Sequence, residues 1–177
     1  MDIDEAIKGR RSIRTYKNDE VKEDLVRDVI EAATYAPSAK NGQQWRFTVL
    51  TGESKDNFTD MYRSELDKLT VDVGSSYGSC TMMEEAPVVI VVWNTNERGW
   101  TTEVHSVSAA IQNILLKAHA LGLGTCWIGD IFYTYEAIMD YFKKPWKLLA
   151  TITLGWSDAT PGAKTILSVD EVTEFLN

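Results

Sequence analysis

Three arginines and a hydroxyl group lie within five residues near the start of the chain, in the segment Arg10-Arg11-Ser12-Ile13-Arg14. Guanidinium groups are permanently charged, and their planar donors bind phosphate oxygens in pairs. Placing three of them so close together creates a repulsion that an anionic ligand relieves. A short run of arginines more often forms a solvated basic turn. The segment therefore indicates an anion-binding site only in combination with a second polar segment.

A second polar segment, from Pro37 to Gln44, combines hydroxyl, amide and glycine residues. It follows an apolar pattern of helical period that should end at Ala36, because Pro37 disfavours helical geometry in the residue before it. Side-chain amides both donate and accept hydrogen bonds. Asn41 and Gln43 therefore suit a flat heterocycle edged with N–H and C=O groups, such as the pyrimidine end of a flavin. An ordinary polar loop rich in turn formers is the alternative.

The composition is that of a compact enzyme domain, with 177 residues of which 44% are hydrophobic and 25% charged. The net charge of -8 argues against nucleic-acid binding and makes the arginine cluster a local exception that favours a specific anion site. The longest apolar run, residues 86–93, is too short to span a bilayer. The absence of a targeting segment and of a disulfide framework predicts a cytoplasmic location without a membrane partner.

The chain alternates predicted helices and strands without repeats or linkers. Helices are expected at residues 2–9, 22–35, 54–68 and 103–121, strands at 46–50, 87–93 and 148–156, and a short terminal helix at 169–176. Ser54 is the expected N-cap of the third helix, and Gly122 is expected to stop the fourth. The glycine-bearing segment Gly74-Ser75-Ser76-Tyr77-Gly78 is expected to form a loop.

Together the two polar segments resemble the FMN-dependent nitroreductase family. The segment Ala118–Gly129 and the apolar run Ala86–Val92 match the same family, and all four matches follow its order. The resemblance implies an α+β fold with a central mixed sheet flanked by helices, and a single FMN-binding domain over residues 1–177. It also implies an interlocked homodimer, with residues 157–177 as a C-terminal arm that packs at the dimer interface.

The resemblance also assigns roles around the cofactor. Arg10, Arg11 and Ser12 would hold the phosphate, and Arg14 would stabilise the reduced flavin near N1 and the C2 carbonyl. In the family, Ser38 and Asn41 or Gln43 reach the flavin from the other subunit, and a backbone N–H of residues 127–129 faces flavin N5. Lys164 is the only candidate for the basic residue that the family's tail supplies. The full set of expected cofactor contacts is Arg10, Arg11, Ser12, Arg14, Pro37, Ser38, Ala39, Asn41, Gln43, Trp127, Ile128, Gly129 and Lys164.

The implied activity is reduction of the flavin by NADH or NADPH, followed by reduction of a small organic acceptor such as a nitroaromatic, quinone or enone. No protein group need act as catalyst, because the chemistry is carried by the flavin. No metal site is expected, since His105 and His119 would lie roughly 21 Å apart on one helix. The candidate aromatic walls of the acceptor pocket are Tyr77, Trp93, Trp100 and Phe132, with the alternative that they belong to the core, as aromatic residues more often do.

Two other functions remain open from the residues alone. The first is a serine hydrolase, because Gly74–Gly78 matches the G-x-S-x-G motif, with Ser76 as nucleophile and Glu97 and His105 following in a permissible order. The second is a flavin-binding module without catalysis, since binding residues alone do not establish turnover.

Overall fold

The computed structural model describes residues 1–96 and 101–176. Its elements in chain order are α1 (Ile3–Gly9), α2 (Glu23–Thr34), η1 (Ala39–Asn41), β1 (Trp45–Thr51), α3 (Gly52–Leu66), α4 (Ser76–Glu85), β2 (Val88–Asn94), α5 (Thr101–Ala120), β3 (Leu123–Ile128), η2 (Asp130–Thr134), α6 (Tyr135–Phe142), β4 (Lys147–Trp156) and α7 (Val169–Val172). The strands form one sheet in the order β1-β2-β4-β3.

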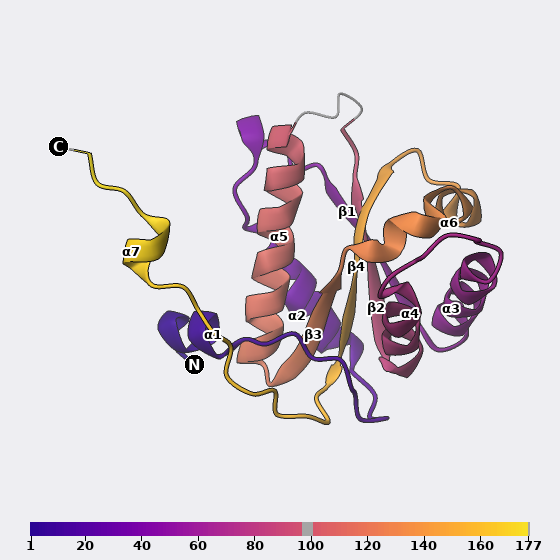
Figure 1. Cartoon of the computed structure of the whole chain (residues 1–177), viewed down its shortest axis with the longest axis horizontal. Helices are drawn as coiled ribbons and strands as arrows, with labels where there is room; N and C mark the ends of the chain where they lie inside the picture. Colours follow the sequence, from indigo (N-terminus) through magenta and orange to yellow (C-terminus); the bar gives the residue numbers. More distant parts are fainter. Residues whose placement is uncertain (97–100, 177) are drawn as a thin grey trace.

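Two helical layers enclose the sheet. Helices α2 and α5 cover one face, while α3, α4 and α6 cover the other (Figure 1). Strand β2 explains why both faces are covered, because every residue from Val88 to Asn94 is buried. Its alternate side chains enter two separate cores, with Val89, Val91 and Trp93 on one face and Val88, Ile90 and Val92 on the other. The expected α+β architecture is confirmed.

All three strand pairings in the sheet are antiparallel. The parallel component of the expected mixed sheet is a single bridge between Ser12 and Thr125, beside the edge strand β3. A further isolated bridge joins Tyr16 to Ser157. The arginine segment is therefore attached to the sheet edge rather than lying in a free turn.

Most predicted elements are present, with small shifts at their ends. Helix α3 begins at Gly52 and not at Ser54, so the prediction of Ser54 as N-cap was wrong. Thr51 is the N-cap, and the Ser54 hydroxyl accepts a hydrogen bond from the Thr51 N–H at 3.2 Å, as the third helical residue of a capping box does. Gly122 has φ +80° just after α5, which confirms it as the residue that ends that helix.

Two expectations for local structure were wrong. The segment expected to be a loop at 74–78 becomes helical at Ser76, where α4 begins. Its low-propensity residues are held by packing, since Cys80 and Met83 are fully buried. The terminal helix expected at 169–176 covers only Val169–Val172, with Ser168 as its N-cap. It is short because no side chain of this helix is buried, so no tertiary packing stabilises further turns.

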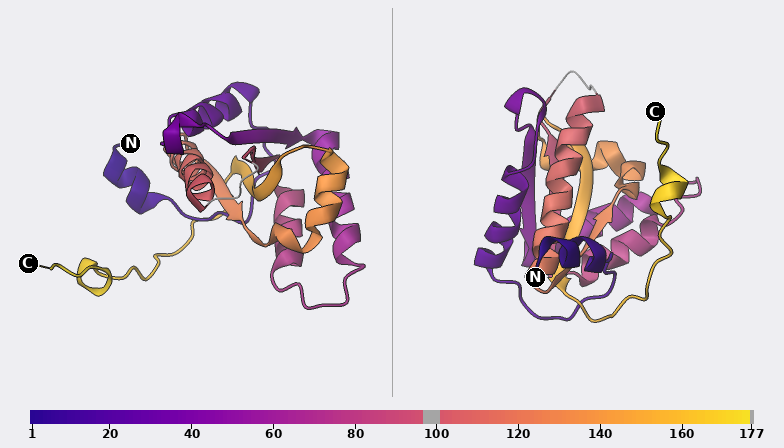
Figure 2. Two further views of the ribbon diagram at one scale, coloured as in Figure 1. Left: turned by 90° about the horizontal axis from the view of Figure 1, so that it is seen from above. Right: turned by 90° about the vertical axis from the view of Figure 1, so that its left-hand side faces the viewer.

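The last 20 or so residues of the described chain leave the globular body as an arm. Figure 1 and the left view of Figure 2 show it extending away from the sheet and helices. Six large apolar side chains on it are 62–84% exposed: Ile166, Leu167, Val169, Val172, Phe175 and Leu176. Such a run of exposed apolar surface is typical of a segment that packs on a partner.

Gly155 in β4 tests the packing of the sheet against the N-terminal segment. A Cβ at this position would lie 2.6 Å from Pro87 Cδ and 2.8 Å from Tyr16 Cδ1. We expect Gly155→Ala to lower the free energy of unfolding by about 1–3 kcal/mol, because the surrounding core must shift. Gly162→Ala is the control, since nothing lies within 4 Å of its added Cβ. Equal urea midpoints for the two variants would contradict this packing.

Candidate active site

The arginine segment lies along the outer edge of β3. The Ile13 N–H donates to the Thr125 carbonyl at 2.9 Å. The Ile13 side chain is buried in the core, and the Tyr16 hydroxyl donates to the Ile13 carbonyl at 2.8 Å. The same hydroxyl lies 2.6 Å from Thr153 Oγ1. These contacts fix the backbone from which the neighbouring arginine side chains extend.

Among the described residues, two of the three guanidinium groups in this segment have hydrogen-bond partners, all of them backbone carbonyls, and that of Arg10 has none. Arg11 Nη1 donates to the carbonyls of Lys8 at 2.6 Å and Arg10 at 3.0 Å, and Arg14 Nη1 donates to Ser12 O at 3.4 Å. Arg11 Nε is buried without a partner. Among residues 1–96 and 101–176, none of the ion pairs involves these arginines. Their positive charge is therefore available to an anionic ligand.

The positive field of the segment reaches its neighbours. Burial, and then the charges of Arg10 and Arg11, lower the pKa of His119 near the end of α5. Burial raises the pKa of the Cys126 thiol, while the charges of Arg14, Arg10 and Lys164 oppose that rise. Lys164 in the arm thus lies within electrostatic range of the same edge of the sheet.

A cleft of about 440 Å³ opens where β3 ends beside α4. Its walls are formed by Arg14, Ser75, Gly78, Ser79, Met82, Cys126, Trp127, Ile128, Gly129 and Asp130. A Cβ added at Gly78 or at Gly129 would meet nothing within 4 Å, so both glycines leave open space beside bare backbone. The cleft unites Arg14 with Trp127, Ile128 and Gly129, four of the positions predicted from the sequence.

The predicted amide loop, residues 37–43, has an uncommon backbone. Lys40, Asn41 and Gln43 have φ of 53°, 54° and 45°, in a region that residues other than glycine rarely adopt. The Ser38 hydroxyl accepts from the Gln43 N–H at 3.1 Å, which holds the loop in this shape. Pro37 follows the end of α2 as expected, and the side chains of Asn41 and Gln43 are exposed. Strain of this kind is concentrated at functional sites.

Within one chain, the amide loop and the arginine segment lie at opposite ends of α5 (Figure 1). The Ala39 N–H donates to Ser106 Oγ at 3.2 Å, near the start of the helix. A Cβ at Gly9 would lie 2.7 Å from His119 Nε2, near its end. These two helix positions are separated by roughly 20 Å at about 1.5 Å per residue. A single chain therefore does not bring the two predicted halves of the site together.

The structure separates the predicted pocket aromatics. Trp93 is fully buried, with its Nε1–H donating to Thr48 Oγ1 at 3.0 Å, so its prediction as a pocket wall was wrong. Burial on both faces of β2 explains this. Tyr77 and Phe132 are 40% and 46% exposed, but neither lines the cleft, and Trp100 lies outside the described residues.

The geometry around Ser76 does not support a nucleophile. Ser76 has no exposed surface, and its hydroxyl donates to the Asp130 carbonyl at 3.3 Å. The motif requires a strand that runs directly into the turn bearing the serine, but Val73 and Gly74 before Ser76 belong to a loop. His105 is exposed on α5, and Glu97 lies outside the described residues.

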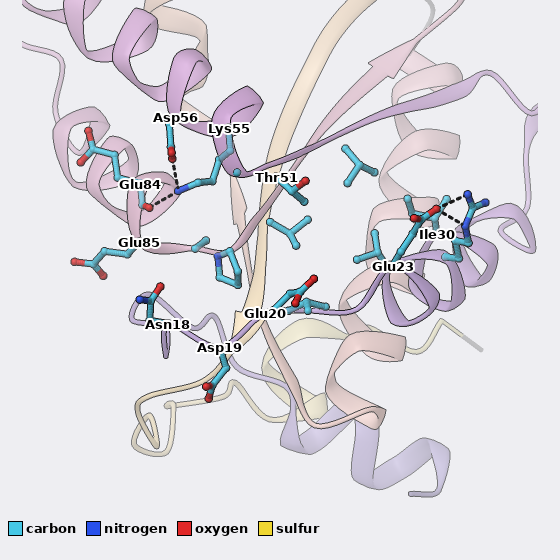
Figure 3. A pocket seen from close by; sticks show the side chains of 18 of the residues that line it. Asn18, Asp19, Glu20, Glu23, Ile30, Thr51, Lys55, Asp56, Glu84 and Glu85 are labelled. Atoms are coloured by element: carbon cyan, nitrogen blue, oxygen red, sulfur yellow. Dashed lines mark hydrogen bonds and ion pairs between the residues drawn. The ribbon is translucent and has the colours of Figure 1, made fainter.

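A larger groove of about 1260 Å³ lies elsewhere, between α2, β1 and the adjoining ends of α3 and α4. Figure 3 shows that carboxylates surround it, among them Glu20, Glu23, Glu84 and Glu85. Lys55 in its wall donates to the Glu84 carbonyl at 2.5 Å and pairs with Asp56 at 3.1 Å. None of the predicted cofactor contacts lines this groove, and its charge is opposite to that required for a phosphate.

A search for other kinds of site adds two observations about the described part of the chain. It contains no group of three or more His, Cys, Asp or Glu side chains placed to hold a metal ion. None of its helices combines the length and apolarity needed to cross a membrane.

A model of the nitroreductase family matches residues 7–156. The chain belongs to the nitroreductase family. A relative from Methanothermobacter thermautotrophicus, whose name includes NAD(P)H nitroreductase, is 35% identical over 97% of this chain and 86% of its own. The expectation of family membership from the sequence is thereby confirmed.

Solved structures with the nitroreductase fold agree with this assignment. One from Desulfovibrio desulfuricans, described in complex with FMN, has a TM-score of 0.81 and 29% identity over 98% of this chain and 95% of its own. An FMN-dependent nitroreductase from Clostridium difficile has a TM-score of 0.78 and 27% identity over 99% of both chains.

Sequence reasoning missed several residues of the cleft, among them three that form a hydrogen-bonded group. Asp130, Ser75 and Ser79 line the cleft and are joined by hydrogen bonds. Ser75 belongs to the segment interpreted as a loop or as a hydrolase motif, and Ser79 directly follows that segment. Their contact with Asp130, 51 or more positions away, depends on the packing of α4, which the apolar pattern did not indicate.

Proposed function

We propose that this protein is an FMN-dependent oxidoreductase that takes a hydride from NADH or NADPH and passes electrons to a small organic acceptor. The observation that carries the proposal is a set of three guanidinium groups without carboxylate partners among the described residues, beside a glycine-walled cleft. Family membership and the FMN complex of the Desulfovibrio structure support the same conclusion.

The residues present fit FMN. Its phosphate suits Arg10, Arg11 and Ser12, and the buried Arg11 Nε without a partner is a donor that an anion would satisfy. The isoalloxazine ring suits the open space beside Gly129, with a backbone N–H of residues 127–129 facing N5. When bound, FMN supplies the hydride chemistry. The protein orients it, shields it and supplies positive charge.

The proposed assembly is a homodimer that shares each flavin between subunits. Pro37, Ser38, Ala39, Asn41 and Gln43 of a second copy would complete the cleft, since one chain holds its own loop at the far end of α5. The C-terminal arm, residues 157–177, would pack on that copy and bring Lys164 toward the phosphate. The exposed apolar residues of the arm support this arrangement. The proposed organisation is a single domain with this arm. Its two unpaired cysteines fit a reducing, cytoplasmic compartment.

Purification tests the cofactor directly. The protein should be yellow, and denaturation should release one FMN per chain, identified by mass spectrometry. A colourless protein that remains colourless after incubation with FMN would overturn the proposal. A fluorophosphonate probe should leave Ser76 unlabelled; labelling there would revive the hydrolase alternative.

Arg14 is proposed to tune the reduction potential. Negative charge accumulates at N1 and C2 when flavin is reduced, and a fixed cation nearby stabilises it. Arg14→Gln keeps a donor and removes the charge, so the midpoint potential should fall by tens of millivolts, with about 30 mV for each 1.4 kcal/mol lost. Spectroelectrochemical titration of the flavin-saturated variant measures this. A variant that loses FMN but keeps the parent potential when re-saturated would make Arg14 only an anchor.

A further inference from the structure

Asp130 is a partly buried carboxylate in the wall of the cleft, next to Gly129. Its Oδ2 accepts from Ser75 Oγ at 2.5 Å and from Ser79 Oγ at 3.1 Å. Its Oδ1 is buried and has no partner. The Asp130 carbonyl also accepts from Ser76 Oγ at 3.3 Å. Two serines at the start of α4 thus hold the carboxylate in one orientation, while a third binds the backbone of the same residue. Part of the hydrogen-bonding capacity of the carboxylate is unused.

Only two of the residues that line the cleft carry a charged side chain, Arg14 and Asp130. No ion pair joins them among the described residues. Because the proposed function places Arg14 against the flavin, Asp130 is the charge that remains for a second ligand in the cleft. Gly78 also lines the cleft, and a Cβ added there would meet nothing within 4 Å, so its side of the cleft is open to a second, flat group.

We propose that Asp130, held by Ser75 and Ser79, makes this cleft select flat acceptors that are cationic or carry hydrogen-bond donors, and reject acceptors that carry a carboxylate. The inference rests on the proposed function and names the substrate class of the same site. A carboxylate on the ligand would face a fixed negative charge in a confined cleft, whereas an amidinium or amide would donate to it. The serines keep the charge in place, so the preference is built into the resting protein.

Two rigid ligands of nearly equal size and opposite charge test the selection without turnover. Benzamidinium and benzoate are titrated into the FMN-loaded protein, with calorimetry and the perturbation of flavin absorbance as readouts. Benzamidinium should bind about tenfold more tightly or better, the difference expected from one charge-assisted hydrogen bond. Asp130→Asn should abolish that preference. The control, Asp28→Asn, removes an exposed carboxylate on α2 and should retain it.

The titrations of the parent protein are a sufficient test by themselves. If the parent protein binds benzoate as tightly as benzamidinium or more tightly, the inference is overturned even if no variant folds. An Asp130→Asn protein that keeps the parent preference also overturns it. Turnover should follow binding. In the Asp130→Asn variant, the rate of 4-nitrobenzoate reduction should rise relative to that of an uncharged nitrobenzene. FMN retention and bleaching by a nicotinamide, measured on the same sample, show whether the proposed function holds when the charge preference fails. A protein that holds no FMN overturns both.

Discussion

Arg10→Ala is expected to raise the dissociation constant for FMN by about ten- to hundredfold. The loss of one charge-assisted hydrogen bond to a phosphate costs about 1.5–3 kcal/mol. The backbone of Arg10 caps α1 through a 3.1 Å bond to the Ala6 carbonyl, which alanine retains, so the fold should be unaffected. Titration of FMN into the apo-protein, followed by quenching of flavin fluorescence, measures the constant.

Arg27→Ala is the matched control for this prediction. Arg27 is an exposed arginine on α2 and is paired with Glu23; helix α2 covers the opposite face of the sheet from α4, which lines the cleft. Its removal should leave FMN affinity unchanged. If both variants bind FMN as tightly as the parent protein, the phosphate lies elsewhere and the role proposed for the arginine segment is wrong.

Charges placed on the C-terminal arm should dissociate the proposed dimer. In the double variant Ile166→Asp with Phe175→Asp, two side chains that are 78% and 77% exposed in one chain become acidic. If both are buried against a second copy, each loses about 1.5–3 kcal/mol of apolar burial, and association weakens on the order of hundredfold or more. FMN affinity should fall with it, because the amide loop of the second copy leaves the site. Analytical ultracentrifugation measures the mass at several concentrations.

Val71→Asp provides the comparison for the arm variant. Val71 is an apolar residue of the α3–α4 loop with 61% exposure, so the change adds a surface charge of the same kind outside the arm. It should leave both mass and FMN content as in the parent. A parent protein that is saturated with FMN and sediments as a monomer at nanomolar concentration would contradict the shared site.

The elements that were predictable from the sequence are those with a strong local signal. The continuous β-branched run in β2 and the apolar period of α5 each indicate one structure, and Gly122 marks the helix end. Strand β3 was not predicted, because Gly124 and Thr125 weaken its pattern and its place depends on pairing with β4. Gly124 is required there by a neighbour far away in the chain, since a Cβ would lie 2.7 Å from Ile13.

The candidate site divides in the same way. Arg14 was predicted from its charge and its place in the arginine segment, and residues 127–129 from the resemblance to the family; the structure brings them to one cleft. The resemblance to the family implied that the amide loop serves the other subunit, but the position of this loop at the far end of α5 in its own chain was not predicted. Asp130 and its serine partners depend on how α4 packs, which no local pattern encodes. Trp93 was predicted to line the pocket but lies in the core, because its strand is covered by helices on both faces.

Anaerobic mixing of the FMN-loaded protein with NADH or NADPH tests the proposed enzyme most directly. Stopped-flow absorbance should show the flavin bleaching with at least one of the two nicotinamides, and its colour should return when a nitroaromatic or quinone is added. A protein that holds one FMN per chain but is bleached by neither nicotinamide at saturating concentration would contradict an NAD(P)H-dependent oxidoreductase and leave a flavin-binding module in its place.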